Sequence, residues 1–226
     1  MKRILGLVAA LALAAPSQAL AAIGCTLSNP AQDLKSLFPE MTTYREELKE
    51  FTRLKDGAAL YAAFKERVGG VTDPVYEGFE SPYTLYTVFK GKEKVGIVHG
   101  VNVPGRGGVI QVFLWTDPIS AEIRKFFFQR LESPAAKVLR AKDFRTRFEG
   151  LTLADYYKHD YYAKAEPGSS ADKLAAIPVP VLDADGAADH AATLRGIRKN
   201  LVLLDLFVYG RRFDPFFERA RKEEKK

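Results

Sequence analysis

The most informative part of the chain runs from Val95 to Asp117 and reads VGIVHGVNVPGRGGVIQVFLWTD. Apolar residues alternate over 95–103, and β-branched and aromatic residues fill 109–115. Both patterns are typical of β-strands. The intervening PGRGG combines a proline of fixed φ with glycines that tolerate positive φ, which is turn chemistry. This part of the chain therefore predicts two antiparallel strands joined by a glycine-rich turn.

Flanking segments extend this hairpin into a sheet. Tyr83–Lys90 alternates in the same way and is followed by a tight turn, so three strands in a row form a meander. Ile119–Leu131 has features of both helix and strand, and we take it as a fourth strand that completes the sheet. Two proline-containing strands are also expected, over Val71–Glu80 and Ile177–Leu182.

Helical spacing of apolar residues appears before and after the strands. The longest helical signal runs from Ala192 to Val208, and the polar, tyrosine-rich stretch Leu151–Ala165 is expected to be a loop or a short strand. Further helices are predicted over Asp33–Leu37, Tyr44–Leu54, Ala58–Val68, Ala135–Arg140 and Lys142–Phe148. Helices that pack on an antiparallel sheet place the protein in the α+β class.

The chain divides by sequence into four parts. Residues 1–21 are a signal peptide, 22–70 an N-terminal helical segment, 71–210 the main domain and 211–226 a basic tail. The signal peptide has a positive start, an apolar stretch over Ile4–Ala15 and a small-x-small site at Ala19-Leu20-Ala21. We therefore expect export to the periplasm.

Charge and cysteine content exclude several classes. The formal net charge is +6, but glutamates interrupt the basic tail, so we expect a solvated, frayed terminus rather than a nucleic-acid-binding one. Cys25 is the single cysteine, so an internal disulfide is excluded. The sequence around Cys25 weakly resembles a lipobox, which leaves a lipoprotein as an alternative to a soluble periplasmic protein. Membrane contact is expected only if Cys25 carries lipid.

The sequence contains no motif that predicts a catalytic site. Gly-x-Ser-x-Gly is absent, and the glycine-rich turn precedes a strand rather than opening a helix, as a phosphate loop does. His159 stands beside Asp155 and Asp160, but neighbours in sequence do not face one metal, and further ligands are missing. At Thr193, a hydroxyl stands where a loop is expected to enter the last long helix. One interpretation is that this helix start binds a phosphate. The alternative is that Asp189 or Thr193 only caps the helix.

Four parts of the sequence, in order, resemble the periplasmic FMN-binding domain family of the NqrC, RnfG and NosR type. They are the hairpin GRGGVIQVFLWTD, the Glu-Ser-Pro at 132–134, FRTRFEG at 144–150 and AATL at 191–194. Their order and spacing carry the resemblance, which covers 83–208.

The resemblance implies a site and a function. In the family, a separate flavin transferase joins FMN through a phosphoester to a threonine, which here is Thr193. The flavin would be lined by Gly107, Gly108, Glu132 and Ser133, while His190, Ala192 and Leu194 flank Thr193. The protein would then be an electron-transfer flavoprotein, a carrier without catalytic turnover of its own. Its redox partner would be a cytochrome or a membrane redox complex.

The sequence departs from the family at this last motif. His190 and Ala191 replace the family's Ser or Thr and its Gly, the usual Asp is displaced, and Ala135 follows Pro134 instead of a glycine. If the transferase requires the glycine and the Asp, Thr193 stays unmodified, and the flavin is then bound without a covalent link or is absent. The alternative function is a flavin-free copy of the fold that serves as a structural or partner-binding domain.

Overall fold

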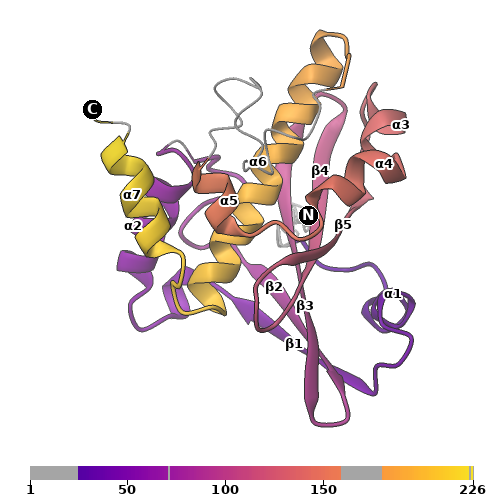
Figure 1. The fold of residues 1–226 in the computed structure, drawn as a ribbon, viewed down its shortest axis with the longest axis vertical. Helices are drawn as coiled ribbons and strands as arrows, with labels where there is room; N and C mark the ends of the chain where they lie inside the picture. The colour runs from indigo at the N-terminus through magenta and orange to yellow at the C-terminus, as the bar shows by residue number, and fades with distance from the viewer. Residues whose placement is uncertain (1–24, 71, 159–179, 224, 226) are drawn as a thin grey trace, which may run out of the picture.

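The computed structural model describes residues 25–70, 72–158, 180–223 and 225. Its centre is a five-stranded antiparallel sheet in which strands that are consecutive in sequence are neighbours. The predicted α+β class is confirmed (Figure 1). The strands are β1 Thr43–Lys49, β2 Tyr83–Lys90, β3 Glu93–Gly105, β4 Gly108–Thr116 and β5 Ile123–Arg130.

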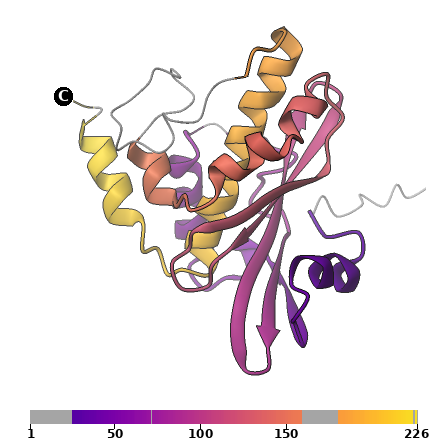
Figure 2. The same ribbon diagram turned by 45° about the vertical axis from the view of Figure 1, so that its right-hand side comes forward.

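Helices and short 3-10 turns surround the sheet. Figure 2 shows α1 on one face of the sheet and α6 on the other. Their bounds are α1 Pro30–Leu37, η1 Phe51–Arg53, α2 Gly57–Arg67, α3 Ala136–Leu139, α4 Lys142–Arg145, η2 Thr146–Phe148, α5 Leu153–Lys158, α6 Ala184–Phe207 and α7 Asp214–Glu223.

Alternation along the strands divides the core between the two faces of the sheet. In β4, Ile110, Val112 and Leu114 belong to the large cluster under α6, whereas Phe113 belongs to a smaller cluster on the opposite face. The smaller cluster includes Cys25 and residues of α1. The period-two pattern that predicted these strands is thus the pattern that fills both layers.

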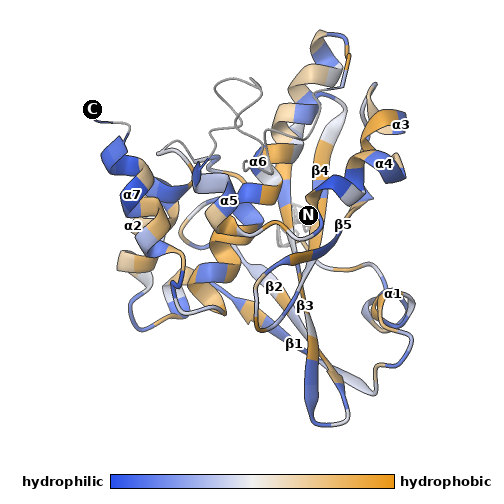
Figure 3. Ribbon diagram, in the orientation of Figure 1, coloured by the Kyte–Doolittle hydropathy of each residue, from blue (hydrophilic) through white to orange (hydrophobic). Residues whose placement is uncertain are grey.

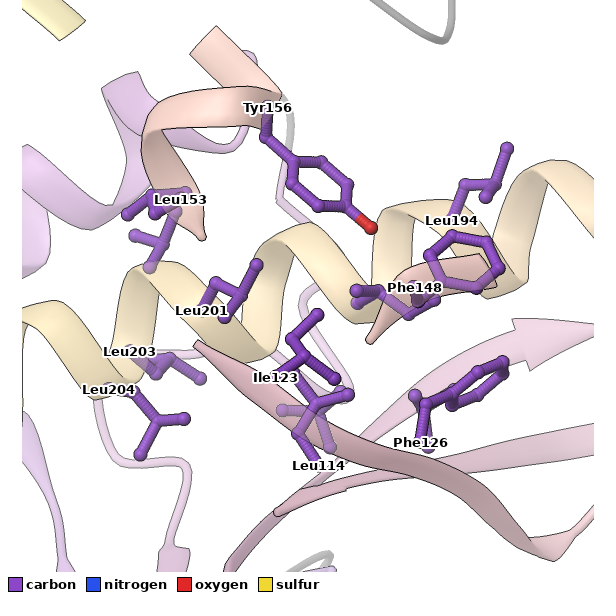
Figure 4. Close-up of a cluster of buried hydrophobic side chains, with 14 of the residues drawn as sticks. Leu114, Ile123, Phe126, Phe148, Leu153, Tyr156, Leu194, Leu201, Leu203 and Leu204 are labelled. Atoms are coloured by element: carbon purple, nitrogen blue, oxygen red, sulfur yellow. The ribbon is translucent and has the colours of Figure 1, made fainter. Parts of the chain in front are cut away.

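The long helix α6 forms the main packing surface of the large cluster. Figure 4 shows Leu194, Leu201 and Leu204 of α6 in one buried cluster with the sheet residues Leu114 and Ile123. The helix approaches the sheet closely at Gly196, where an added Cβ would lie 3.0 Å from a methyl group of Val112. Apolar burial of this extent is the dominant stabilising term in such a fold.

The N-terminal segment differs from its prediction. Tyr44–Leu54 was expected to be helical, but β1 pairs with β2 over its whole length, from Thr43 opposite Phe89 to Lys49 opposite Tyr83. Residues of good helix propensity form the edge strand here because the partner strand supplies the hydrogen bonds. The sheet therefore crosses the expected boundary between residues 70 and 71.

Other predicted elements also differ. Within 72–80 the structure has turns and no strand, and Leu151–Ala165 begins as helix α5, with Tyr156 and Tyr157 buried. The predicted strand Ile177–Leu182 lies mostly outside the described residues, and 180–182 is not a strand. The expected frayed tail forms α7 instead, where Phe216 and Phe217 pack against the large cluster.

The start of the last long helix is the correction that matters most for the site. α6 begins at Ala184, eight residues before the predicted start at Ala192. Asp183 is its N-cap, and its side chain accepts a hydrogen bond of 2.7 Å from the backbone nitrogen of Gly186. Thr193 consequently lies in the interior of the helix and not at its mouth.

Candidate functional site

The glycine turn, the Glu-Ser-Pro corner and the start of α6 do meet in the structure. An added Cβ at Gly107 would lie 2.2 Å from the backbone oxygen of Glu132, and one at Gly108 would lie 3.8 Å from its carboxylate. Gly186, in the first turn of α6, packs against Ala135, which follows the corner. The turn and the corner are thus in direct contact, with no space for a ligand between Gly107 and Glu132.

The start of α6 is acidic. Asp183, Asp185 and Asp189 lie in its cap and first two turns, and residues 183–192 contain no serine or threonine. Asp189 is buried and accepts a 2.7 Å hydrogen bond from the backbone nitrogen of Arg106, while Asp185 pairs with the side chain of Arg106 at 3.4 Å. Carboxylates at this point repel a phosphate, so the residues at this end of α6 do not fit one.

Thr193 is fully buried, and its hydroxyl donates a 2.8 Å hydrogen bond to the backbone oxygen of Asp189 one turn earlier. His190 and Leu194 are also in the core, and the ring of His190 lies 5.6 Å from that of Phe144. Burial lowers the pKa of His190 to about 4, so the imidazole is neutral at pH 7. These three side chains behave as core residues.

The two remaining predicted residues divide between the corner and a cavity. The hydroxyl of Ser133 accepts a 3.1 Å hydrogen bond from the backbone nitrogen of Ala135 and so shapes the turn into α3. Ala192, by contrast, is half-buried and faces a different side of α6, where it lines a cavity. The structure therefore groups Gly107, Gly108, Glu132 and Ser133, and separates them from Ala192.

The cavity beside Ala192 has a volume of about 580 Å³. Such a volume is within the range of small-molecule and cofactor sites, about 300–1,000 Å³. Its apolar wall comes from Val68 at the end of α2 and from Val103 and Pro104 at the end of β3. Its charged wall contains Arg195 and Arg198 of α6 and Asp73 of the segment that follows α2.

A buried ion cluster holds Arg195 in place. Both terminal nitrogens of Arg195 contact the carboxylate of Glu77, at 2.5 and 2.6 Å, and Lys199 lies 3.3 Å from the same carboxylate. Burial on its own raises the pKa of Glu77, but the hydrogen bonds from Arg195 and the charge of Lys199 outweigh it and lower that pKa. The cluster fixes the segment around Glu77 against α6.

Arg198 is held differently. Its Nε donates a 3.1 Å hydrogen bond to the backbone oxygen of Arg67, and its guanidinium lies 5.8 Å from the ring centre of Tyr157. Arg195 and Arg198 thus lie three residues apart on one helix, the first paired with a carboxylate and the second held by a backbone oxygen and an aromatic ring. Sequence reasoning missed both, because α6 carries other charged residues, such as Asp189, Lys199 and Asp205, and the spacing of Arg195 and Arg198 does not set them apart from these.

The described residues also bear on metal binding and membrane crossing. Within the described ranges, no group of histidine, cysteine, aspartate and glutamate side chains could hold a metal ion. His159, which the sequence did not favour as a metal ligand, lies outside those ranges. The neighbouring Asp155 accepts hydrogen bonds from the backbone nitrogen and the hydroxyl of Thr152. Among the described helices, none is long and apolar enough to cross a membrane.

No family model matches the chain, and no curated protein sequence matches it. Among solved structures, the crystal structure of Shewanella oneidensis NqrC superposes with a TM-score of 0.45 and 13% sequence identity, over 87% of this chain and 90% of that one. This superposition is too loose to assign a family, a cofactor or a binding residue to this chain.

Proposed function

We propose that this protein is an exported electron-transfer module that binds FMN without a covalent bond. The observation that supports the proposal is the cavity of about 580 Å³ beside Ala192, which combines an apolar wall with two guanidinium groups. FMN combines a flat apolar ring with a phosphate, and the two walls suit those two parts. The sequence resemblance to FMN-binding domains supports the same ligand.

The residues around the cavity suggest how the flavin would be held. Val68, Val103 and Pro104 would contact the ring, and Arg198 would bind the phosphate by charge-assisted hydrogen bonds, with Arg195 held beside it by Glu77. Bound FMN accepts and donates one or two electrons, so the protein supplies binding, orientation and electrostatics only. This agrees with a carrier that passes electrons to a redox partner protein without catalytic turnover of its own.

Covalent attachment through Thr193 fits the structure poorly. The hydroxyl is fully buried inside α6 and already donates to Asp189, so a flavin transferase could reach it only if the helix opened. The acidic residues Asp183, Asp185 and Asp189 at the helix start add an electrostatic cost for the incoming phosphate. We therefore assign the flavin to the cavity and expect no transferase as a partner.

The same burial of Thr193 also favours a second candidate, a flavin-free copy of the fold that binds a partner protein. The two candidates differ in a direct measurement. Apoprotein is titrated with FMN while flavin fluorescence is recorded, and the intact mass of protein isolated from its native periplasm is determined. Non-covalent binding predicts fluorescence quenching with a saturable curve and an unmodified polypeptide mass.

Matched variants locate the site. Ala192→Phe places a ring in the cavity, whereas Ala191→Phe places the same ring on an exposed position one residue away. FMN binding should be lost in the first variant and retained in the second. Absence of FMN binding by the native protein supports the flavin-free candidate. An added FMN mass that disappears in Thr193→Ala contradicts non-covalent binding.

A further inference from the structure

The segment from α3 to η2 concentrates positive charge on one side of the molecule. Between residues 137 and 147 there are five basic side chains and one carboxylate, that of Asp143. Figure 3 shows α4 as a strongly hydrophilic ribbon beside β5. We call the five basic residues the basic corner: Lys137, Arg140, Lys142, Arg145 and Arg147.

Two arginines of the basic corner are fixed by backbone oxygens of the neighbouring strand β5. Arg140 donates to the backbone oxygen of Phe128 at 3.1 Å, and Arg145 donates to that of Phe126 at 3.4 Å. Arg145 also donates to the backbone oxygen of Arg140 at 3.0 Å. A carbonyl holds a guanidinium in place without neutralising its charge, so both groups are ordered and remain fully cationic.

The other side chains of the basic corner also have no carboxylate partner among the described residues. Arg147 donates to the backbone oxygen of Asp143 at 2.9 Å rather than to its carboxylate. Among the described residues, no carboxylate lies within ion-pair distance of any basic-corner side chain, whereas Arg124 and Arg130 of β5 both have carboxylate partners. The positive field of the corner is therefore not cancelled locally.

A small cavity opens within the basic corner. It has a volume of about 290 Å³ and is lined by Phe127, Phe128, Arg140 and Arg145. The guanidinium of Arg140 lies 5.8 Å from the ring centre of Phe128, which keeps it over an aromatic face. A hollow with two fixed cations on its wall has the size and charge to receive one acidic side chain.

We propose that the basic corner docks an acidic surface of a partner protein, with one partner carboxylate seated between Arg140 and Arg145. Complementary charge accelerates encounter and sets orientation, and a guanidinium pairs well with a carboxylate. A lipid surface fits less well, because membrane-binding segments insert several large apolar side chains. Here Val138 is the exposed large apolar residue of the segment, at 37% exposure. This inference does not depend on flavin binding.

Paired charge reversals test the location of the docking surface. Lys137→Glu with Lys142→Glu changes the basic corner, and Lys92→Glu with Lys94→Glu makes the same charge change at the exposed β2–β3 turn, at the other end of the sheet. The probe is fluorescein-labelled hexaglutamate, followed by anisotropy at low and physiological salt. The corner pair should weaken binding by about tenfold or more and the control pair by less than about threefold.

A third variant tests whether the partner carboxylate binds between Arg140 and Arg145. Arg145→Lys keeps the charge but loses the fixed planar donor group, so the peptide affinity should fall by about threefold or more, with the thermal midpoint checked in parallel. Unchanged affinity overturns the seating between the two arginines. Equal losses in the two lysine pairs, or no peptide binding, overturn the docking surface. Binding to phosphatidylglycerol vesicles without peptide binding assigns the corner to lipid and also overturns it.

Discussion

The side-chain nitrogen of Lys199 lies 3.3 Å from a carboxylate oxygen of Glu77, and both side chains are fully buried. Lys199 also donates to the backbone oxygens of Asn102 and Tyr76, at 2.9 and 3.1 Å. These contacts tie α6 to β3 and to the segment that forms one wall of the candidate cavity. The pair is therefore a structural link that keeps a buried lysine charge beside a buried carboxylate.

This link predicts a specific pH dependence of stability. Burial lowers the pKa of Lys199 from 10.5 to about 8, although the charge of Glu77 opposes the shift. Between these values the unfolded chain binds more protons at Lys199, so the contribution of Lys199 to the free energy of unfolding should rise with pH from 8 to 10.5. One proton contributes at most about 1.4 kcal/mol per pH unit.

Denaturant unfolding of the native protein and of Lys199→Met at several pH values measures this contribution. The difference between the two curves is the relevant quantity, because the buried Tyr157 and Tyr209 titrate in both proteins. Burial raises the pKa of each tyrosine to about 12, which lowers stability at high pH equally in the two. Curves that stay parallel from pH 8 to 10.5 would contradict the assignment to Lys199.

A second prediction concerns the contact between the glycine turn and the corner. Gly107→Ala places a Cβ 2.2 Å from the backbone oxygen of Glu132, and neither backbone can yield without displacing the hairpin or the start of α3. The variant should lose about 2–4 kcal/mol of the free energy of unfolding. Gly91→Ala is the control, because its added Cβ meets nothing within 4 Å and its φ of +59° costs only about 1 kcal/mol. Similar losses in both variants would argue against the close contact.

The sequence was sufficient to predict most of the sheet but not its first strand. β2 to β5 have the alternation and turn residues that predict strands, and they form as expected. β1 contains Tyr-Arg-Glu-Glu-Leu-Lys, whose propensities favour a helix, and becomes a strand only because β2 offers an open edge. Tertiary pairing of this kind is invisible to local propensity.

The candidate site was predictable only in part, for a similar reason. The contact among Gly107, Glu132 and the α6 region follows from the order of the motifs, whereas the start of α6 was hidden by Gly186 and the aspartates around it, which are poor helix formers. The cavity brings Arg195 together with residues that follow α2, more than 100 positions earlier in the chain. No local sequence pattern predicts a contact between residues so far apart in the chain.

A third prediction addresses the single thiol. Cys25 is 3% exposed and packs in the smaller cluster, and burial raises its pKa. Ellman's reagent should therefore react slowly with the native protein and rapidly with one thiol per chain in denaturant, since the thiolate is the reactive form. A mature protein whose thiol reacts at the same rate in both conditions would contradict this packing. Intact mass of the exported protein tests separately whether Cys25 carries lipid.

The last prediction concerns the ion pair that joins α2 to α6. Arg67 and Asp205 have side-chain exposures of 2% and 0%, and their closest atoms are 2.5 Å apart. Arg67 also donates to the hydroxyl of Tyr157 at 2.7 Å and pairs with Asp214, at the start of α7, at 3.0 Å. Asp205→Asn should cost about 3–5 kcal/mol of the free energy of unfolding, because it leaves a buried guanidinium with an incomplete countercharge.

The exposed pair of Glu66 and Arg221 provides the control for this measurement. It joins α2 to α7 at side-chain exposures of 50% and 41%, so Glu66→Gln should cost less than about 1 kcal/mol. The double variant Arg67→Met with Asp205→Leu should be less destabilised than Asp205→Asn alone, because it leaves no buried charge unpaired. If the double variant is instead the least stable of the three, the network on Tyr157 and Asp214 contributes more than the ion pair. Denaturant unfolding at fixed pH and salt distinguishes these outcomes.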